Sequence, residues 1–198
     1  MPPVNTFNIN KKYNFQTGSA FGGQVKKRPV VWLTEDQIPL LLSTDDDEFK
    51  KFLQLLLYTG MRRNEALELT WSDIDDNINI RPEISKNGIG RQIVLNSNLK
   101  TILSQGSQIS QERLFPNYTP NQISMKFMRW VREIGLPAGT KLHSIRATFA
   151  CQLLVKGVDI FTISKLLGHS SIKITEKYYL ALDQSKARNA VEKLCFDI

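Results

Sequence analysis

The stretch TGMRRNEALELTWSDIDDNINIR, residues 59–81, contains the change of pattern that decides the fold. Its first two residues are a typical helix end, since glycine adopts the left-handed C-cap conformation without strain. A second helical pattern begins at Arg62 and continues to Leu69. From Asn77 to Arg81 polar and apolar residues alternate, which is the period of a strand. The stretch therefore predicts two helices followed by a strand.

The predicted strand is the first half of a β-hairpin in an otherwise helical chain. Asn87-Gly88 is a strong turn signal, and the segment RQIVL at 91–95 returns as a second strand. Capping-box spacing predicts a helix start at Thr34, and Thr119-Pro120 predicts the start of a long helix. Other helices are expected after residue 47 and at 143–156, 159–167, 171–181 and 183–195. The expected core faces are Phe49, Phe52, Leu53 and Leu56 in one helix and Ile123, Phe127, Val131 and Ile134 in the long one. The fold class is thus α+β, mainly α-helical, with a small antiparallel hairpin.

The composition fits one globular core with an anionic partner. The chain has 198 residues and a net charge of +7, and residues 101–150 carry six basic residues against two acidic ones. Such a local excess favours nucleic acid as the partner. The sequence shows neither a membrane-length apolar run nor a signal-peptide pattern, so we expect no membrane contact and an intracellular location.

Residues 1–28 are polar, and they end in the basic triplet Lys26-Lys27-Arg28. This composition is typical of a flexible linker or arm. The triplet is either a solvated part of that linker, which we favour, or a DNA contact. Residues 29–198 are expected to form the folded domain, with a helix in the C-terminal tail.

The chain has only two histidines, and both lie in motifs with phosphate-binding character. His143 and Arg146 are three residues apart on one predicted helix, so they share a face. His169 follows a glycine break and precedes Tyr178 by nine residues. Arginine binds phosphate bidentately and stays charged, and Arg62 occupies a helix start that also favours anions. A tyrosine oxygen can attack phosphorus and be released again.

Two of these residues have ordinary explanations when they are taken alone. Lys86 precedes the predicted turn, where a lysine could protonate a leaving oxygen but more often only confers solubility. Tyr178 could be a packed aromatic rather than a nucleophile. On spacing alone, we favour the ordinary explanation for both.

Metal chemistry has little support in the sequence. The two histidines are 26 residues apart and have no neighbouring carboxylate pattern. The three aspartates at 45–47 are explained by helix capping and the helix dipole. We expect no metal site. A different basic feature lies on the long helix, where Lys126, Arg129 and Arg132 recur every third residue and predict contacts with DNA.

Taken together, these motifs resemble the tyrosine recombinase (phage integrase) family over about residues 30 to 182. The matching segments are TGMRRNE at 59–65, LTWSDID at 69–75, SKNG at 85–88, LHSIRATFA at 142–150, LLGHSSI at 166–172 and TEKY at 175–178. Any single match could arise by chance, whereas the ordered set is specific. The resemblance therefore reverses the preference stated above for Lys86 and Tyr178.

The resemblance implies a role for each of these residues on double-stranded DNA. Four of them would hold the scissile phosphate, namely Arg62, His143, Arg146 and His169. Lys86 would protonate the 5′-hydroxyl leaving group, and Tyr178 would form a 3′-phosphotyrosyl link. Glu65 would orient an arginine. The family needs no metal and no cofactor, and a bacterial or phage origin implies action in the cytoplasm.

The sequence departs from the family pattern mainly in size. Members usually carry a helical core-binding domain before the catalytic domain, and residues 1–28 are too short to form one. The spacing selects Tyr178 over the adjacent Tyr179 as nucleophile. The C-terminal tail is amphipathic, and in this family such tails often bind a neighbouring subunit, so we expect self-association through it. Two alternatives remain: relaxation of DNA like that of a type IB topoisomerase, or a DNA-binding module that has lost catalysis.

Overall fold

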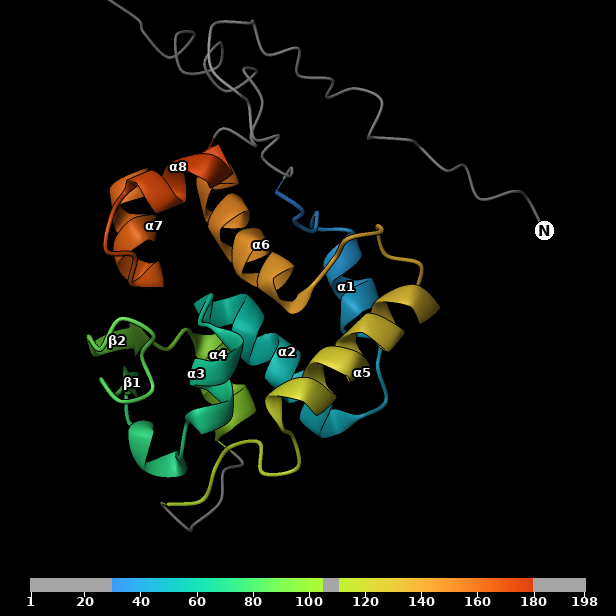
Figure 1. Ribbon diagram of the computed structural model, residues 1–198, viewed down its shortest axis with the longest axis horizontal. Helices are drawn as coiled ribbons and strands as arrows, with labels where there is room; N and C mark the ends of the chain where they lie inside the picture. The colour runs from blue at the N-terminus through green and yellow to red at the C-terminus, as the bar shows by residue number, and fades with distance from the viewer. Residues whose placement is uncertain (1–29, 105–110, 180–198) are drawn as a thin grey trace, which may run out of the picture. The chain divides into compact units, whose positions relative to one another are not determined.

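The computed structural model describes residues 30–104 and 111–179, all of which belong to one compact unit. The predicted arm at 1–28 and the tail helix at 183–195 lie outside these residues. The order of the elements is α1 (Gln37–Leu41), α2 (Asp47–Thr59), α3 (Arg63–Glu68), the 3-10 turn η2 (Trp71–Asp73), β1 (Asn77–Ile80), β2 (Arg91–Val94), α4 (Ser97–Leu103), α5 (Pro120–Glu133), α6 (Leu142–Val155), α7 (Ile160–Leu167) and α8 (Lys173–Tyr179) (Figure 1). The predicted fold class, mainly helical with one antiparallel hairpin, is confirmed.

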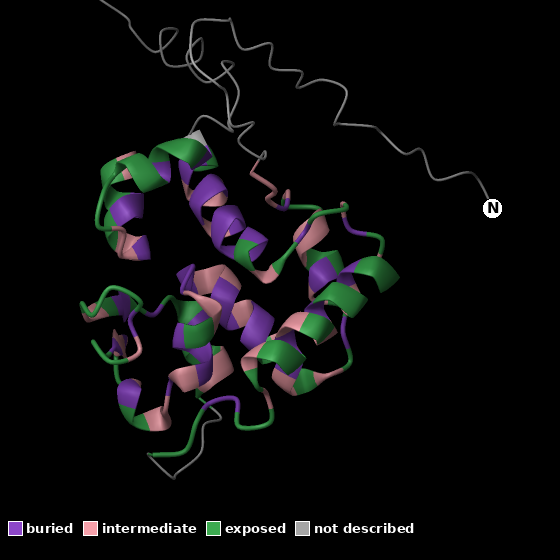
Figure 2. Cartoon of the chain, viewed as in Figure 1, coloured by how far each residue is buried: buried purple, intermediate pink, exposed green. Residues whose placement is uncertain are grey.

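Helix α2 lies at the centre of the core. Asp46 caps its N-terminus by accepting a hydrogen bond from the Phe49 amide, at 2.8 Å. The predicted apolar face is buried, and the Phe52 ring meets Phe115 edge-on at 5.2 Å between centroids. α2 packs against α6, which also contacts α7 and α8 (Figure 1). Both helices carry many buried residues (Figure 2), and in α6 the five consecutive residues 144–148 are buried, so this part of the helix is covered on every side.

The hairpin has a long connecting loop, and its strands lie where they were predicted. β1 and β2 pair antiparallel from Asn77 opposite Val94 to Ile80 opposite Arg91, so ten residues connect them. Within this loop the Gly88 amide donates to the Ser85 carbonyl at 3.1 Å, and the Gly88 φ of 66° is left-handed. The glycine thus ends a turn inside a longer loop.

Two helix predictions need correction, and one helix was not predicted. α1 begins at Gln37 with Asp36 as its N-cap rather than at Thr34, although the Thr34 amide donates to Gln37 Oε1 at 3.1 Å, as in a capping box. α8 starts at Lys173, two residues later than expected. α4 was not predicted, although the Asn96 side chain caps it by accepting from the Leu99 amide at 2.8 Å. Seven residues are too few for a clear helical period.

Candidate active site

Two glycine helix ends bring the predicted phosphate-binding motifs together. Gly60 ends α2 and Gly168 ends α7, both in the left-handed conformation. A Cβ on Gly60 would overlap the Phe149 ring and approach a Leu167 methyl at 2.8 Å. Gly60 therefore serves two purposes, because it permits the turn and lets α2 lie directly against α6 and α7.

Arg146 joins these two helix ends through hydrogen bonds. From α6 its Nη1 donates to the Gly60 carbonyl and its Nη2 to the Leu167 carbonyl, both at 2.7 Å. The side chain is buried, and burial followed by the charge of Arg62 lowers the pKa of its guanidinium to about 10. Arg146 thus remains charged at neutral pH while it fixes the turns that precede Arg62 and His169.

Glu65 holds Arg62 and a second arginine. Arg62 is the N-cap of α3; its Nη1 donates to Glu65 Oε1 at 2.7 Å, and its amide donates to Oε2 at 2.8 Å. Arg91 donates to both oxygens of the same carboxylate. Burial acts to raise the pKa of Glu65, but the hydrogen bonds and charge of Arg91, with the bonds from Arg62, lower it overall. The carboxylate is therefore ionised, although it is almost fully buried.

His169 is fixed next to the tyrosine predicted as nucleophile. Its Nδ1 lies 2.8 Å from the Thr175 hydroxyl, and its ring stacks with that of Tyr178 at 6.3 Å between centroids. Burial lowers the pKa of His169 to about 4, and the charges of Arg146 and Arg62 act in the same direction. The imidazole is therefore neutral at pH 7 and carries one N–H.

Tyr178 has a buried hydroxyl group. The side chain is 1% exposed, and its Oη lies near the Arg146 guanidinium but makes no hydrogen bond of good geometry with the described residues. Burial raises the pKa of the phenol, while the nearby charge of Arg146 opposes this rise. A buried polar atom without a partner is destabilising, so this oxygen is held in place by its surroundings at the expense of stability.

His143 and Lys86 lie at the open side of the site. His143, in the first turn of α6, is exposed to solvent at its edge. Partial desolvation lowers its pKa, followed by the charges of Lys177, Arg146, Arg62 and Lys86. Lys86 is exposed in the hairpin loop, and its charge reaches His143 even though the described contacts include no bond between the two.

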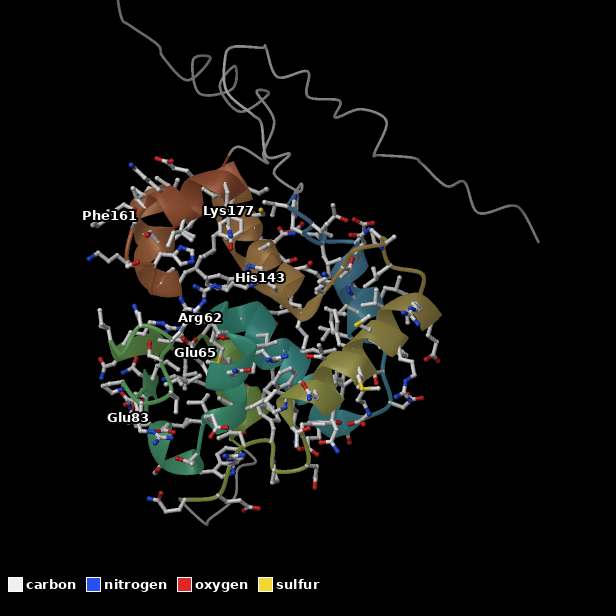
Figure 3. The ribbon with its side chains drawn as sticks, in the orientation of Figure 1. Arg62, Glu65, Glu83, His143, Phe161 and Lys177 are labelled. Carbon is white, nitrogen blue, oxygen red and sulfur yellow. The ribbon has the colours of Figure 1, made fainter. Side chains whose placement is uncertain are left out.

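The sequence-based reasoning missed two cations, Arg91 and Lys177. Arg91 opens β2, and Lys177 precedes the tyrosine with its Nζ 4.8 Å from the centre of the Tyr178 ring. Figure 3 shows Lys177 of α8 together with His143 of α6 and with Arg62 and Glu65 at the start of α3. In the interpretation of the sequence, Arg91 was only a polar position of the second strand, and Lys177 was only part of the TEKY segment. Partial burial, then the charge of Arg146, lowers the pKa of Lys177.

The three residues of the predicted DNA-binding stripe differ in their surroundings. The ammonium of Lys126 pairs with Asp46 and lies over the Phe49 ring. Arg129 and Arg132 are exposed on α5. The contact with Asp46 explains Lys126 without DNA, so only the two arginines present unoccupied charge to an approaching backbone.

Most of the charged side chains of the site are cations that are held in fixed positions. Within residues 30–104 and 111–179, no group of three or more His, Cys, Asp or Glu side chains could hold a metal ion. In the same ranges no helix is both long and apolar enough to cross a membrane. Arginines and histidines beside a tyrosine are groups that suit an anionic ligand such as a phosphate.

Comparison with known proteins identifies the family. Residues 31–186 match the model of the phage integrase family, and the chain belongs to this family. It is 33% identical to the tyrosine recombinase XerA of Saccharolobus solfataricus over 165 residues, which are 81% of this chain and 56% of the relative. It is 32% identical to the tyrosine recombinase XerC of Roseiflexus castenholzii over 145 residues, covering 65% of this chain and 46% of the relative.

Solved structures show the same fold. The catalytic domain of bacteriophage HP1 integrase superposes with a TM-score of 0.64 at 25% identity, covering 83% of this chain and 95% of that domain. A XerA recombinase crystal structure gives 0.69 at 24% identity, covering 85% of this chain and 66% of that one. The fold is therefore that of a tyrosine recombinase catalytic domain. The chain spans about half the length of the two curated relatives above.

Proposed function

We propose that this chain is the catalytic domain of a site-specific DNA recombinase or integrase, which cuts and rejoins strands through a 3′-phosphotyrosyl intermediate. The observation that supports this most is the cation cluster around Tyr178. The charges of Arg146 and Arg62 act on Tyr178, the ring of His169 stacks with it, and Glu65 is the one carboxylate that the described ion pairs bring to Arg62. The family and its named recombinases support the same activity.

In the cleavage step, Tyr178 Oη forms a bond to phosphorus while the bond from phosphorus to the 5′-oxygen breaks. The phenolic proton passes to His143, whose lowered pKa leaves it neutral and able to accept it. Lys86 gives a proton to the departing 5′-oxygen. Religation is the reverse, with the 5′-hydroxyl of another strand as the attacking group. Each bond broken is replaced by one of similar energy, so we expect neither a metal nor a cofactor to be needed.

Charge that develops on the non-bridging oxygens is met by groups already in place. Arg146 is held by two carbonyls, and Arg62 by Glu65, so little reorganisation is needed when the phosphate enters. If the Thr175 hydroxyl donates to His169 Nδ1, the remaining N–H at Nε2 is free to donate to the phosphate. Glu65 acts by orienting Arg62.

Trapping the covalent intermediate tests this function directly. The probe is a pool of nicked DNA duplexes with randomised sequence around the nick, so that the short cut strand diffuses away and the adduct persists. Adducts that survive denaturation are recovered and sequenced. We expect the wild-type chain to form them with a subset of sequences, and EDTA to have no effect. If the wild-type chain forms no adduct with any sequence, the proposed cleavage is contradicted, and a binding assay on the same duplexes then tests whether the chain is a DNA-binding module.

The DNA interface and the assembly are further parts of the proposal. We place Arg129 and Arg132 on the DNA backbone, and we expect Arg129→Gln with Arg132→Gln to weaken binding and to reduce its salt dependence. Lys126→Gln should reduce stability instead. The tail after residue 179 is proposed to mediate self-association on DNA, so a chain cut there should sediment as a smaller complex. Action in the cytoplasm follows from the DNA substrate.

A further inference from the structure

Arg91 contacts the part of the site that orients Arg62. Its Nη1 donates to Glu65 Oε1 at 3.1 Å and its Nη2 to Oε2 at 2.7 Å. The same two oxygens accept the Nη1 and the amide of Arg62. Each carboxylate oxygen thus receives one bond from each arginine. Because Glu65 is 1% exposed, water cannot replace a donor that is lost.

Arg91 also contacts the turn that carries His169. A Cβ on Gly168 would lie 2.8 Å from Arg91 Cδ and 3.0 Å from its Nε, so the arginine side chain fills the space beside this glycine. The side chain is 12% exposed, and its Nε has no hydrogen-bond partner among the described residues. One side chain therefore meets both the holder of Arg62 and the residue before His169.

We infer that Arg91 is a positioning residue for DNA cleavage, which fixes Glu65, and through it Arg62, and sets the place of the turn before His169. This inference rests on the proposed function. Arg91 is not among the site residues expected from the sequence. In this role it acts without touching the phosphate.

The charges explain why one arginine on Glu65 would not be enough. Arg62 is 26% exposed, and it must face a phosphate that carries the same sign of charge as Glu65. If Arg62 were its only partner, the buried carboxylate of Glu65 would direct all of its acceptor sites at Arg62. It would then compete with the DNA phosphate for the Arg62 guanidinium. Arg91 supplies the other two donors and a second positive charge, so Arg62 keeps its position and remains available to the phosphate.

The test compares three variants on the duplex recovered as an adduct. Arg91→Met keeps the aliphatic packing beside Gly168, and Arg91→Lys keeps the charge. Arg113→Met is the matched control, since Arg113 pairs with Glu68 at the same 2.7 Å on the surface. Each variant is assayed on the ordinary phosphodiester and on a methylphosphonate at the scissile position. The methylphosphonate carries no negative charge, so it depends less on the position of Arg62.

We expect Arg91→Met to slow adduct formation about 10- to 100-fold on the phosphodiester, with little change in the DNA concentration needed for half-maximal rate. The defect should shrink at least severalfold on the methylphosphonate. Arg91→Lys should recover part of the rate, and Arg113→Met should match the wild type. Equal defects on both substrates would mean that Arg91 only stabilises the fold, and a wild-type rate in Arg91→Met would also overturn the inference.

A crystal structure of Arg91→Met separates this inference from the proposed function. It requires no cleavage, so it decides the matter even if the wild-type chain forms no adduct. We expect the Arg62 guanidinium or the His169 ring to leave its position. If both stay in place to within coordinate error, Arg91 does not position them.

Discussion

The two ends of helix α2 hold charge in opposite ways. Before its N-terminus, Asp46 pairs with Lys126 and accepts from the Tyr118 hydroxyl, so that each charge has a partner. Beyond its C-terminus, Arg62 and Arg91 share the carboxylate of Glu65. Arg146, Lys177 and the two histidines lie in the same group, but the described ion pairs give them no carboxylate. The first arrangement needs no ligand, whereas the second lacks an anion.

The direction of the pKa shifts shows the same contrast. Burial acts to raise the pKa of Asp46, but hydrogen bonds from Lys126 and the Phe49 amide lower it overall, as in an ordinary ion pair. At the other end burial, followed by the neighbouring positive charges, lowers the pKa values of His143, His169, Arg146 and Lys177, so each group is pushed toward its uncharged form. An entering phosphate would oppose these shifts. The excess of positive charge thus marks the site as the one that binds an anion.

The largest expected effect is that of Tyr178→Phe. Without the nucleophilic oxygen, adduct formation should fall by more than about 10³-fold, whereas Tyr179→Phe should retain it. Because the Tyr178 Oη is buried without a described partner, its removal should leave the free energy of unfolding unchanged or raise it by about 1 kcal/mol. Denaturing gels measure the adduct and urea unfolding the stability. An adduct in Tyr178→Phe would assign the nucleophile to another residue.

The next largest effect is expected for Arg146→Lys, which separates the binding of phosphate by Arg146 from its contribution to the stability of the fold. Arg146→Lys cannot span the Gly60 and Leu167 carbonyls and the phosphate together, so we expect a loss of about 10²- to 10³-fold in cleavage. The two carbonyls that lose their donor should reduce the unfolding free energy by about 1–3 kcal/mol. Single-turnover kinetics and urea unfolding give the two values. A stable and fully active Arg146→Lys would remove this residue from the site.

A smaller effect is expected for Lys177→Met. Its positive charge disfavours the imidazolium form of His143, so its removal should raise the pKa of that histidine. The acid limb of the cleavage rate against pH should then move to higher pH, with a rate loss of about 2- to 10-fold near pH 6. Lys173→Met, on the same helix, serves as control. An unchanged pH profile would show that Lys177 does not act on His143.

The smallest effect is expected for Asp46, which forms an ion pair with Lys126 before the N-terminus of α2. Asp46→Asn keeps the helix cap but removes the charge partner of Lys126. The folded pKa of Asp46 lies below its ordinary value of 3.8, so the ion pair stabilises the fold above that value and this contribution is lost as the pH falls through the folded pKa. Since the pair is about one-third exposed, we expect a loss below about 1 kcal/mol at pH 7, which vanishes once the pH is below the folded pKa of Asp46. Cleavage should not change; a cleavage defect would mean that the two ends are coupled.

Much of this structure could be predicted from local patterns in the sequence. The glycine helix ends at 60 and 168, the alternation at 77–81 and the face of α2 depend on short-range sterics and periodicity, and each appears as predicted. Tertiary contacts could not be predicted in the same way. Lys126 meets Asp46 across 80 residues, and Arg91 turns toward Glu65 across 26. A spacing rule cannot distinguish such pairs from exposed charges, and this is why Arg91 was missed and the pairing of Lys126 with Asp46 was not predicted.

The central claim, an excess of positive charge built to receive a phosphate, is tested most directly by NMR titration of the histidines. The chain has only two, so their ring signals are readily assigned with one His143→Gln variant. In the free protein we expect the pKa of His169 near 4, well below its ordinary 6.5. Tyr178→Phe bound to the recovered duplex should show a rise of at least about one unit, since the phosphate favours the imidazolium. An ordinary pKa in the free protein, or one that DNA leaves unchanged, would contradict the account.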